Sequence, residues 1–260
     1  MLFRARETSR LKAPVTPEPA TVTLSLASGE VTVALKRNAR ARRYTLRVRA
    51  ATRDVVLTIP GRGSLREALD FAHRHAGWIE VRLARLPETV AFVPGAVIPL
   101  RGVAYRIEAR PEARGTVWTG TDGEGPVLYV AGAPAHLSRR VTDFLKREAR
   151  RDLVGAAQRH ARALGVSIGR VTLRDTASRW GSCSASGALS FSWRLILAPA
   201  FVLDYLAAHE VAHRREMNHG PRFWATVDRL FPEREAAERW LKKHGPDLHR
   251  YGAGEAPEAP

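Results

Sequence analysis

This 260-residue sequence shows no hydrophobic run that could cross a membrane, no secretory signal and no pair of cysteines. No apolar stretch approaches the roughly 20 residues that a membrane helix needs. The first residues, MLFRAR, lack the apolar core that secretory signals carry. With one cysteine, Cys183, the chain cannot close an internal disulfide, which suits a reducing compartment. We therefore expect a cytoplasmic protein with no membrane segment.

Acidic residues are also scarce, because 26 Asp and Glu face 42 Lys and Arg, which gives a formal net charge of +16. Such a balance favours a polyanionic partner, since every phosphate contact releases bound counterions. Solvated surface charge accounts for the same composition equally well. The charge therefore leaves nucleic-acid binding open as an alternative.

An HExxH pattern is formed by His209, Glu210 and His213. Side chains at positions i and i+4 of a helix lie on the same face, so the two histidines can hold one Zn²⁺ between them. Glu210 is then close enough to act on a metal-bound water. The apolar residues at 201–208 indicate a buried helix, in which unpaired polar groups are costly and a metal would satisfy them. An amphipathic helix with two surface histidines is the alternative.

A third ligand is expected just beyond this helix. Asn218 tolerates the left-handed conformation that ends helices, and Gly220 with Pro221 prevents continuation. His219 lies in this reversal, where the chain can fold back toward the metal. Three protein ligands plus water is the arrangement of catalytic zinc, whereas a structural site has four. A carboxylate of the next helix is the other candidate for the third ligand, from Glu233 or Glu235.

Further motifs surround the HExxH pattern in a fixed order, and together they resemble the YgjP-like metallopeptidases, which are similar to the SprT and WLM zinc proteases. The resemblance covers roughly residues 22–250. It implies a zinc peptidase fold with His209, His213 and His219 as ligands and Glu210 as general base, and it implies no particular substrate. The motifs are Lys36 to Arg43, His75-Ala-Gly-Trp-Ile79, Arg179-Trp-Gly-Ser-Cys183, Gly187, Ser192 to Pro199, Met217-Asn-His219 and Arg222-Phe-Trp224.

The pattern of apolar residues along the chain predicts an α+β fold. An N-terminal β-rich region is expected to pack with a C-terminal helical, zincin-like metallopeptidase domain that contains a small sheet. Alternation predicts strands over residues 21–35 and 44–59, and a capping box of Ser64 and Glu67 opens a helix. The expected parts are a flexible segment at 1–20, a β-rich basic region with one helix at 21–135, the metallopeptidase domain at 136–250 and a disordered tail at 251–260.

Basic residues gather in the predicted strands of the N-terminal region, with no acidic residue between Lys36 and Arg49. In an alternating strand, Leu46 and Val48 can be buried while the arginines face outward. One basic face of a sheet would suit non-specific contact with phosphates. The candidate nucleic-acid-binding residues are Arg40, Arg42, Arg43, Arg47 and Arg49.

A hairpin is predicted before the metal helix, from residues 179–184 and 188–197. An exposed strand edge near the metal can align an extended peptide through its backbone groups, and residues 188–194 are the candidate edge or its neighbour. A plain core hairpin packed around Trp180 and Trp193 is the alternative. Arg179 and Ser182 are the candidate substrate-binding residues and donors to a developing oxyanion. Cys183 reads as a small packed residue, with nucleophile or fourth zinc ligand as its alternatives.

Two classes of function fit the metal motif. The first is a zinc metalloendopeptidase acting on protein or peptide substrates, with Glu210 as general base for a metal-activated water. The second is a nucleic-acid-binding protein with a structural or incidental zinc, or a DNA-associated protease that combines both; an amidase is a smaller alternative. Structural zinc sites usually draw four ligands from Cys and His, and only one Cys is present, which favours the enzyme. The sequence does not indicate an oligomeric state.

Overall fold

The computed structural model describes residues 20–49, 53–86, 88–176 and 178–252. The predicted flexible segment at 1–20 and tail at 251–260 lie outside these residues, apart from Ala20, Tyr251 and Gly252. Contacts between Cα atoms divide the chain into two compact units. The first comprises residues 1–48 with 54–82, and the second comprises residues 49–53 with 83–260.

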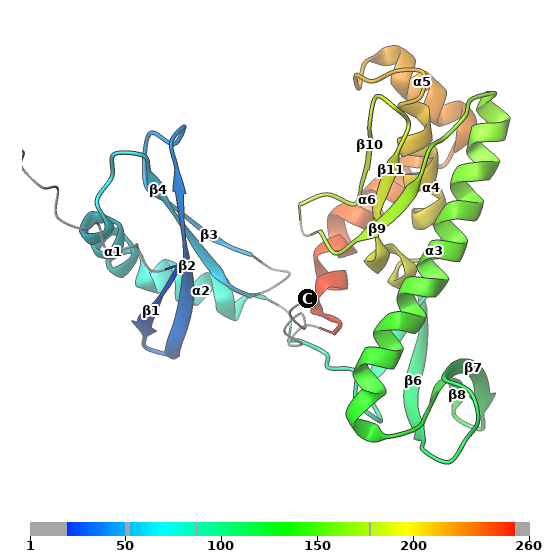
Figure 1. The fold of residues 1–260 in the computed structure, drawn as a ribbon, viewed down its shortest axis with the longest axis horizontal. Coiled ribbons are helices and arrows are strands. Elements are labelled where there is room, and N and C mark those ends of the chain that lie inside the picture. The colour runs from blue at the N-terminus through cyan, green and yellow to red at the C-terminus, as the bar shows by residue number, and fades with distance from the viewer. Residues whose placement is uncertain (1–19, 50–52, 87, 177, 253–260) are drawn as a thin grey trace, which may run out of the picture. The chain divides into compact units, whose positions relative to one another are not determined.

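The first unit is a four-stranded sheet with two helices, drawn in blue and cyan in Figure 1. The strand order is β1-β2-β4-β3, with β2 parallel to β4 and the other pairs antiparallel. Alternate residues of β4 (Val55, Leu57 and Ile59) are fully buried, as expected for a strand with one face in a core. The elements are β1 (Thr21–Leu26), β2 (Gly29–Asn38), β3 (Thr45–Val48), β4 (Val55–Pro60), α1 (Leu65–Arg74) and α2 (Ala76–Ala84).

The single helix expected after Ser64 is wrong, because two helices meet at His75. The hydroxyl of Ser64 caps α1 by accepting the backbone N–H of Glu67 at 3.1 Å, as the capping box predicts. His75 leaves the helical conformation, with φ −106° and ψ 13°, and its N–H bonds to the carbonyl of Ala72 three residues back. Gly77, a poor helix former, follows directly after this break.

The second unit begins with another four-stranded sheet, in the order β5-β6-β8-β7, followed by the long helix α3. The predicted end of α3 is confirmed, because Gly165 caps the helix in the left-handed conformation at φ 69°. The elements are β5 (Val97–Leu100), β6 (Val103–Arg110), β7 (Val117–Asp122), β8 (Gly125–Ala131), η1 (Pro134–His136) and α3 (Leu137–Leu164).

The remainder of this unit is a three-stranded sheet with three helices. The predicted hairpin is confirmed, since β10 pairs antiparallel with β11, but its second arm is shorter than predicted because residues 193–197 form a 3-10 helix. The sheet order is β10-β11-β9, so β11 is central and its neighbour β10 is an edge. The elements are β9 (Val171–Arg174), β10 (Gly181–Cys183), β11 (Leu189–Ser192), η2 (Trp193–Leu197), α4 (Ala200–Ala212), α5 (Pro221–Leu230), α6 (Arg234–His244) and η3 (Gly245–Arg250).

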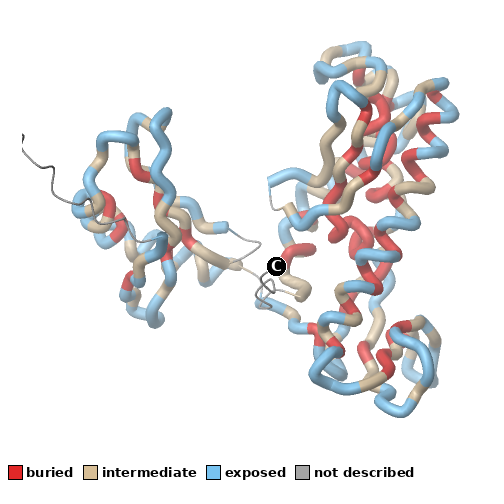
Figure 2. The backbone as a smooth tube through the Cα atoms, viewed as in Figure 1, coloured by how far each residue is buried: buried red, intermediate tan, exposed pale blue. Residues whose placement is uncertain are grey.

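A single hydrophobic cluster runs through the second unit, from Ile107 and Leu128 in the four-stranded sheet to Leu153 in α3 and Val202 in α4. Figure 2 shows buried residues along α3 and in the elements beside it. The contacts thus divide the chain near residue 83, whereas the sequence placed the boundary at residue 136. The physical reason is that α3 contacts both β8 and α4, which joins the two sheets into one core.

The α+β expectation is confirmed by this arrangement of small sheets and helices. Within the described part of the chain, no helix is both long enough and apolar enough to cross a membrane.

Candidate metal centre

The helix α4 contains His209 and is capped by His213, so one helix positions the first two histidines of the candidate site. It starts after Pro199, as the sequence predicts, and its residues are buried on most sides, including Val202, Ala207 and Val211. Such a helix is held rigidly by packing, because it lies against α3, α5 and α6. His209 therefore projects from a fixed position one turn before the end of the helix.

The helix ends earlier than predicted, at Ala212, with His213 as its C-cap in a right-handed conformation. A left-handed Asn218 is wrong, since Arg53 and Arg101 are the non-glycine residues with positive φ in the described chain. Two arginines explain the early end. Arg214 donates to the carbonyls of Ser167 and Ala185 at 3.0 Å, and Arg215 donates to that of Leu164 at 2.7 Å, which ties the turn to two neighbouring loops and to the end of α3.

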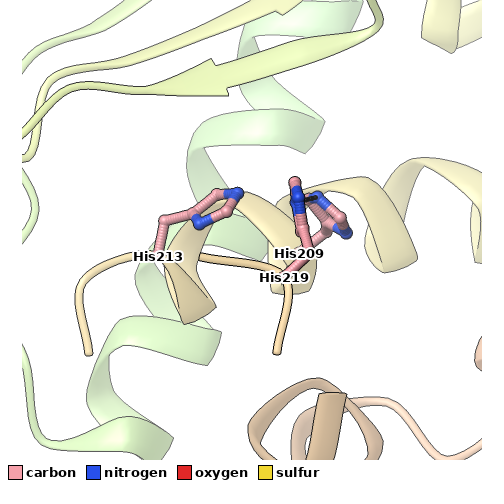
Figure 3. Close-up of side chains that lie close together, drawn as sticks. All are labelled: His209, His213 and His219. Carbon is pink, nitrogen blue, oxygen red and sulfur yellow. Dashed lines mark hydrogen bonds between the residues drawn. The ribbon is translucent and has the colours of Figure 1, made fainter. Parts of the chain in front are cut away.

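The three predicted histidines lie together (Figure 3). One ring nitrogen of each can be chosen so that all lie within 4.8 Å of one another, and the Nε2 atoms of His209 and His219 are 3.2 Å apart. The Nδ1 of His213 is 3.1 Å from the carbonyl oxygen of Glu216. Because a carbonyl can only accept, this Nδ1 carries the proton and the Nε2 lone pair of His213 is left for a ligand.

The chemistry of this donor set fits a zinc ion. Burial, followed by the nearby His213 and His219, lowers the pKa of His209 to about 4. Burial also lowers the pKa of His213. Both imidazoles are therefore neutral near pH 7, as metal binding requires. Three imidazole nitrogens and a water molecule are the ligands that catalytic zinc sites use.

Carboxylates do not join this group in the described residues, where His209, His213 and His219 form the one set of three or more candidate ligands. Glu235, an alternative third ligand, instead accepts from Arg239 at 3.4 Å. Cys183, the alternative fourth ligand, is also outside the set. Its thiol donates to the carbonyl of Ser184, and burial raises its pKa, which disfavours the nucleophilic thiolate.

Aromatic rings of α5 support the three imidazoles from one side. Phe223 is fully buried, and its ring centroid lies 4.9, 4.5 and 4.6 Å from those of His209, His213 and His219. Trp224 stacks on His219 at 5.7 Å with an interplanar angle of 25°. Because Pro221 starts α5 just after the His219 loop, both rings reach the histidines directly.

The carboxyl group of Glu210 lies against the edge strand β10. Glu210 is 4% exposed, and a Cβ added to Gly181 would lie 2.8 Å from the Cδ of Glu210. Burial raises the pKa of Glu210 to about 7, against an opposing effect of the Arg179 cation. A carboxyl group that titrates near neutral pH is suited to proton transfer. Arg179 is exposed, and Ser182 is half-buried in β10.

Tyr205 and Glu238 were not identified from the sequence. The Tyr205 hydroxyl is 3.4 Å from Nδ1 of His209 and donates to Glu238 Oε1 at 2.8 Å. Tyr205 precedes His209 by four residues, so helical spacing alone would have placed the two side chains together. Glu238 is 33 residues from Tyr205, and no local pattern connects them.

The five arginines of the predicted basic face are all exposed. Three of them follow β2 in a loop, Arg47 lies in β3, and Arg49 groups with the second unit rather than the first. The first compact unit therefore contains only four of the five candidate arginines, namely Arg40, Arg42, Arg43 and Arg47.

A helix-borne histidine pair, a third histidine beyond the helix and a buried glutamate are features of a metal-dependent hydrolase. The family model of the YgjP-like metallopeptidase domain matches residues 42–244. This match spans most of the sequence, so the chain belongs to the YgjP-like family of metallopeptidases, and the predicted resemblance is confirmed.

A solved structure, the metallopeptidase zymogen of Pyrococcus abyssi abylysin, is similar at 21% identity, covering 35% of this chain and 93% of its own, with a TM-score of 0.32. No curated protein matches the chain.

Proposed function

We propose that this protein is a zinc metalloendopeptidase that hydrolyses peptide bonds in protein or peptide substrates. The observation that carries the proposal is the convergence of three imidazoles beside a buried glutamate. The nitrogens of His209, His213 and His219 lie within 4.8 Å of one another, and Glu210 follows His209 directly in α4. Membership of a metallopeptidase family supports the same reaction.

Each residue of the site has a defined part in this proposal. His209, His213 and His219 would hold the ion together with a water molecule. A bound Zn²⁺ would supply Lewis acidity, which lowers the pKa of a water molecule on it to near neutral. Glu210 accepts a proton from the attacking water and delivers it to the leaving amine. Burial of the Glu210 carboxyl, which raises its pKa to about 7, supports both steps.

The edge strand β10 is the proposed docking site for substrate. An extended peptide offers the same backbone donors and acceptors whatever its sequence, so it can pair with an exposed edge. Gly181 of β10 lies against Glu210, which would bring a paired peptide next to the general base. Arg179 lies two residues before Gly181 and Ser182 follows it directly, and we assign both to substrate binding, with the Arg179 cation available to a developing oxyanion.

Substitution of Glu210 by glutamine tests this function. Gln is nearly isosteric, so zinc content should be retained while cleavage of casein or of a fluorogenic peptide falls by about 10²–10⁴-fold. Glu235→Gln is the matched control, because Glu235 is an exposed residue of α6 that pairs with Arg239, and it should cleave normally. Wild-type cleavage by the Glu210→Gln variant would remove this residue from the mechanism.

Nucleic-acid binding is a second candidate function, favoured by one observation. Arg40, Arg42, Arg43 and Arg47 are exposed in a stretch without any acidic residue. Such a surface would contact phosphates with little sequence preference. It would recruit substrates associated with nucleic acid to the peptidase, or it would act independently of the metal.

A salt titration of binding to a labelled oligonucleotide tests the second candidate. Replacing the four arginines by glutamine should lower the slope of log K against log salt by about 0.7–0.9 for each lost contact. Zinc content and cleavage of a small peptide should not change. A control variant replaces four exposed arginines of the second unit: Arg139, Arg162, Arg229 and Arg239. An equal loss in both variants, or no binding near 50 mM salt, would leave the charge as solvated surface.

A further inference from the structure

Arg234, the first residue of α6, makes three contacts at once beside the metal centre. Its Nε donates to Asp228 Oδ1 at 2.7 Å, and its Nη1 donates to Glu238 Oε2 at 3.2 Å. Its Cζ atom lies over the ring of Trp224, 4.8 Å from the centroid. The Arg234 side chain is 20% exposed, so these contacts are partly shielded from water.

One chain of contacts leads from Arg234 to His209. Glu238 uses one carboxylate oxygen for Arg234 and the other for the hydroxyl of Tyr205, at 2.8 Å. The Tyr205 oxygen is in turn 3.4 Å from Nδ1 of His209, which is long for a hydrogen bond. Because a carboxylate can only accept, the Tyr205 hydroxyl is the donor to Glu238. Its oxygen is then left to accept from His209.

This direction of donation selects one tautomer of His209. If Nδ1 donates to the Tyr205 oxygen, Nε2 carries the lone pair. That Nε2 is the atom that lies 3.2 Å from Nε2 of His219. The Tyr205 contact therefore both orients the ring and directs the ligand atom toward the other histidines.

A second chain of contacts leads from Arg234 to His219. The guanidinium covers Trp224, and Trp224 stacks on the His219 ring at 5.7 Å. His219 comes from the loop after α4, so it lacks a helix of its own to hold it. His213 is separate from both chains, because its Nδ1 bonds to the carbonyl of Glu216.

We propose that Arg234 is a positioning residue of the metal centre, holding His209 through Glu238 and Tyr205, and His219 through Trp224. This inference rests on the proposed zinc site. It assigns to α6 a role beyond packing, because residues of the last long helix set the orientation of two ligands from α4 and its following loop. Outer contacts of this kind typically change metal affinity by 10–100-fold when they are removed.

The test measures zinc affinity of the purified full-length protein by competition with a chromophoric chelator, using Zn²⁺ alone. Tyr205→Phe should weaken affinity by about 10-fold, since it removes the acceptor for His209 with almost no change of shape. Arg234→Gln should weaken it more, because it disturbs both chains of contacts. The double variant Tyr205→Phe/Glu238→Gln should lose no more zinc affinity than the one of its two single variants that loses more. This is the result expected for residues that act in series. Arg239→Gln, in the same helix but 72% exposed, is the control and should bind normally.

Two further readouts separate positioning from general stability. The visible spectrum of bound Co²⁺ reports ligand geometry and should shift in Tyr205→Phe and Arg234→Gln, but not in Arg239→Gln. Thermal unfolding of the metal-free proteins should leave Tyr205→Phe close to wild type. If Arg234→Gln folds poorly, Tyr205→Phe and Arg234→Lys still test the positioning role. Arg234→Lys keeps the charge but loses the planar group that covers Trp224.

Wild-type zinc affinity and an unchanged cobalt spectrum in Tyr205→Phe and in whichever Arg234 variants fold would overturn the positioning role. The proposed peptidase would survive that result, provided that wild type binds zinc and Glu210→Gln loses cleavage. If wild type binds no zinc, or binds it equally after His209→Ala, both proposals fall together.

Discussion

Replacing Gly181 by alanine puts a methyl group where the Glu210 carboxyl group now lies. The added Cβ would be 2.8 Å from both Cγ and Cδ of Glu210, whereas carbon atoms pack best at about 3.5–4.0 Å. The φ angle of Gly181 is outside the left-handed region, so the backbone itself accepts alanine. The substitution therefore tests one contact, the one between the edge strand β10 and the proposed general base.

The size of the effect follows from which side can move. Glu210 stands on a helix whose neighbouring residues, Val211 and Ala212, are fully buried, so its backbone is held in place. Separating the atoms requires a displacement of roughly 1 Å in the side chain or in β10, and a misplacement of this size costs about 10²-fold in rate. Crowding of this kind also destabilises by about 1–3 kcal/mol, which is a few degrees in Tm.

The assay is kcat/KM on a fluorogenic peptide, measured beside zinc content and Tm. We expect Gly181→Ala to lose about 10²-fold in kcat/KM and to keep its zinc, because the histidines are not touched. Gly155→Ala is the matched control, since its Cβ would meet only Arg159 Nη1 at an ordinary 3.6 Å. Cleavage by Gly181→Ala within two- to threefold of wild type would show that catalysis does not depend on this position of Glu210.

Three more predictions concern a buried histidine, the phenylalanine beside the metal centre and the proposed zinc ligands. His249 stacks on Trp180, and burial, followed by the nearby Arg194, lowers its pKa to about 4. Between about pH 4 and 6.5 the unfolded chain therefore binds more protons at this residue than the folded chain does. Stability should fall with decreasing pH across this window, and His249→Phe should remove up to roughly 3 kcal/mol of that fall in urea unfolding; an identical fall in the variant would contradict this. Phe223→Ala should lower the free energy of unfolding by about 3–5 kcal/mol and weaken zinc binding, because Phe223 is fully buried against all three histidines. Wild-type zinc affinity in this variant would argue against a supporting role for Phe223. His209→Ala/His213→Ala should abolish stoichiometric zinc by elemental analysis, and zinc retained by this variant would place the metal elsewhere.

Local features of the fold were predictable because they depend on short-range periodicity and capping. The spacing of His209 and His213 predicts one helix for both, and the structure has His209 within α4, which ends at Ala212, and His213 as the C-cap of that helix. Gly165 ends α3 as predicted, since glycine adopts the left-handed conformation without steric cost. The hairpin of β10 and β11 likewise follows from alternation and a polar turn.

The end of α4 and the break at His75 depended on contacts that local patterns do not contain. Helical signals continue past residue 212, yet Arg214 and Arg215 bond to carbonyls some 29 to 51 residues away and stop the helix early. The domain boundary has a similar cause, because α3 packs on β8 and on α4 together. Tertiary packing overrides a weak local preference whenever its contacts are more favourable.

The sequence by itself determined the chemistry of the candidate site: which side chains can bind zinc, and which one can carry a proton. The tertiary structure decided which of them meet. It brought His219 rather than Glu233 or Glu235 to the helix pair. It also buried Glu210 against β10, which raises the pKa of its carboxyl. Residue type sets the intrinsic reactivity of a group, whereas burial and neighbouring charge arise only when distant segments pack together.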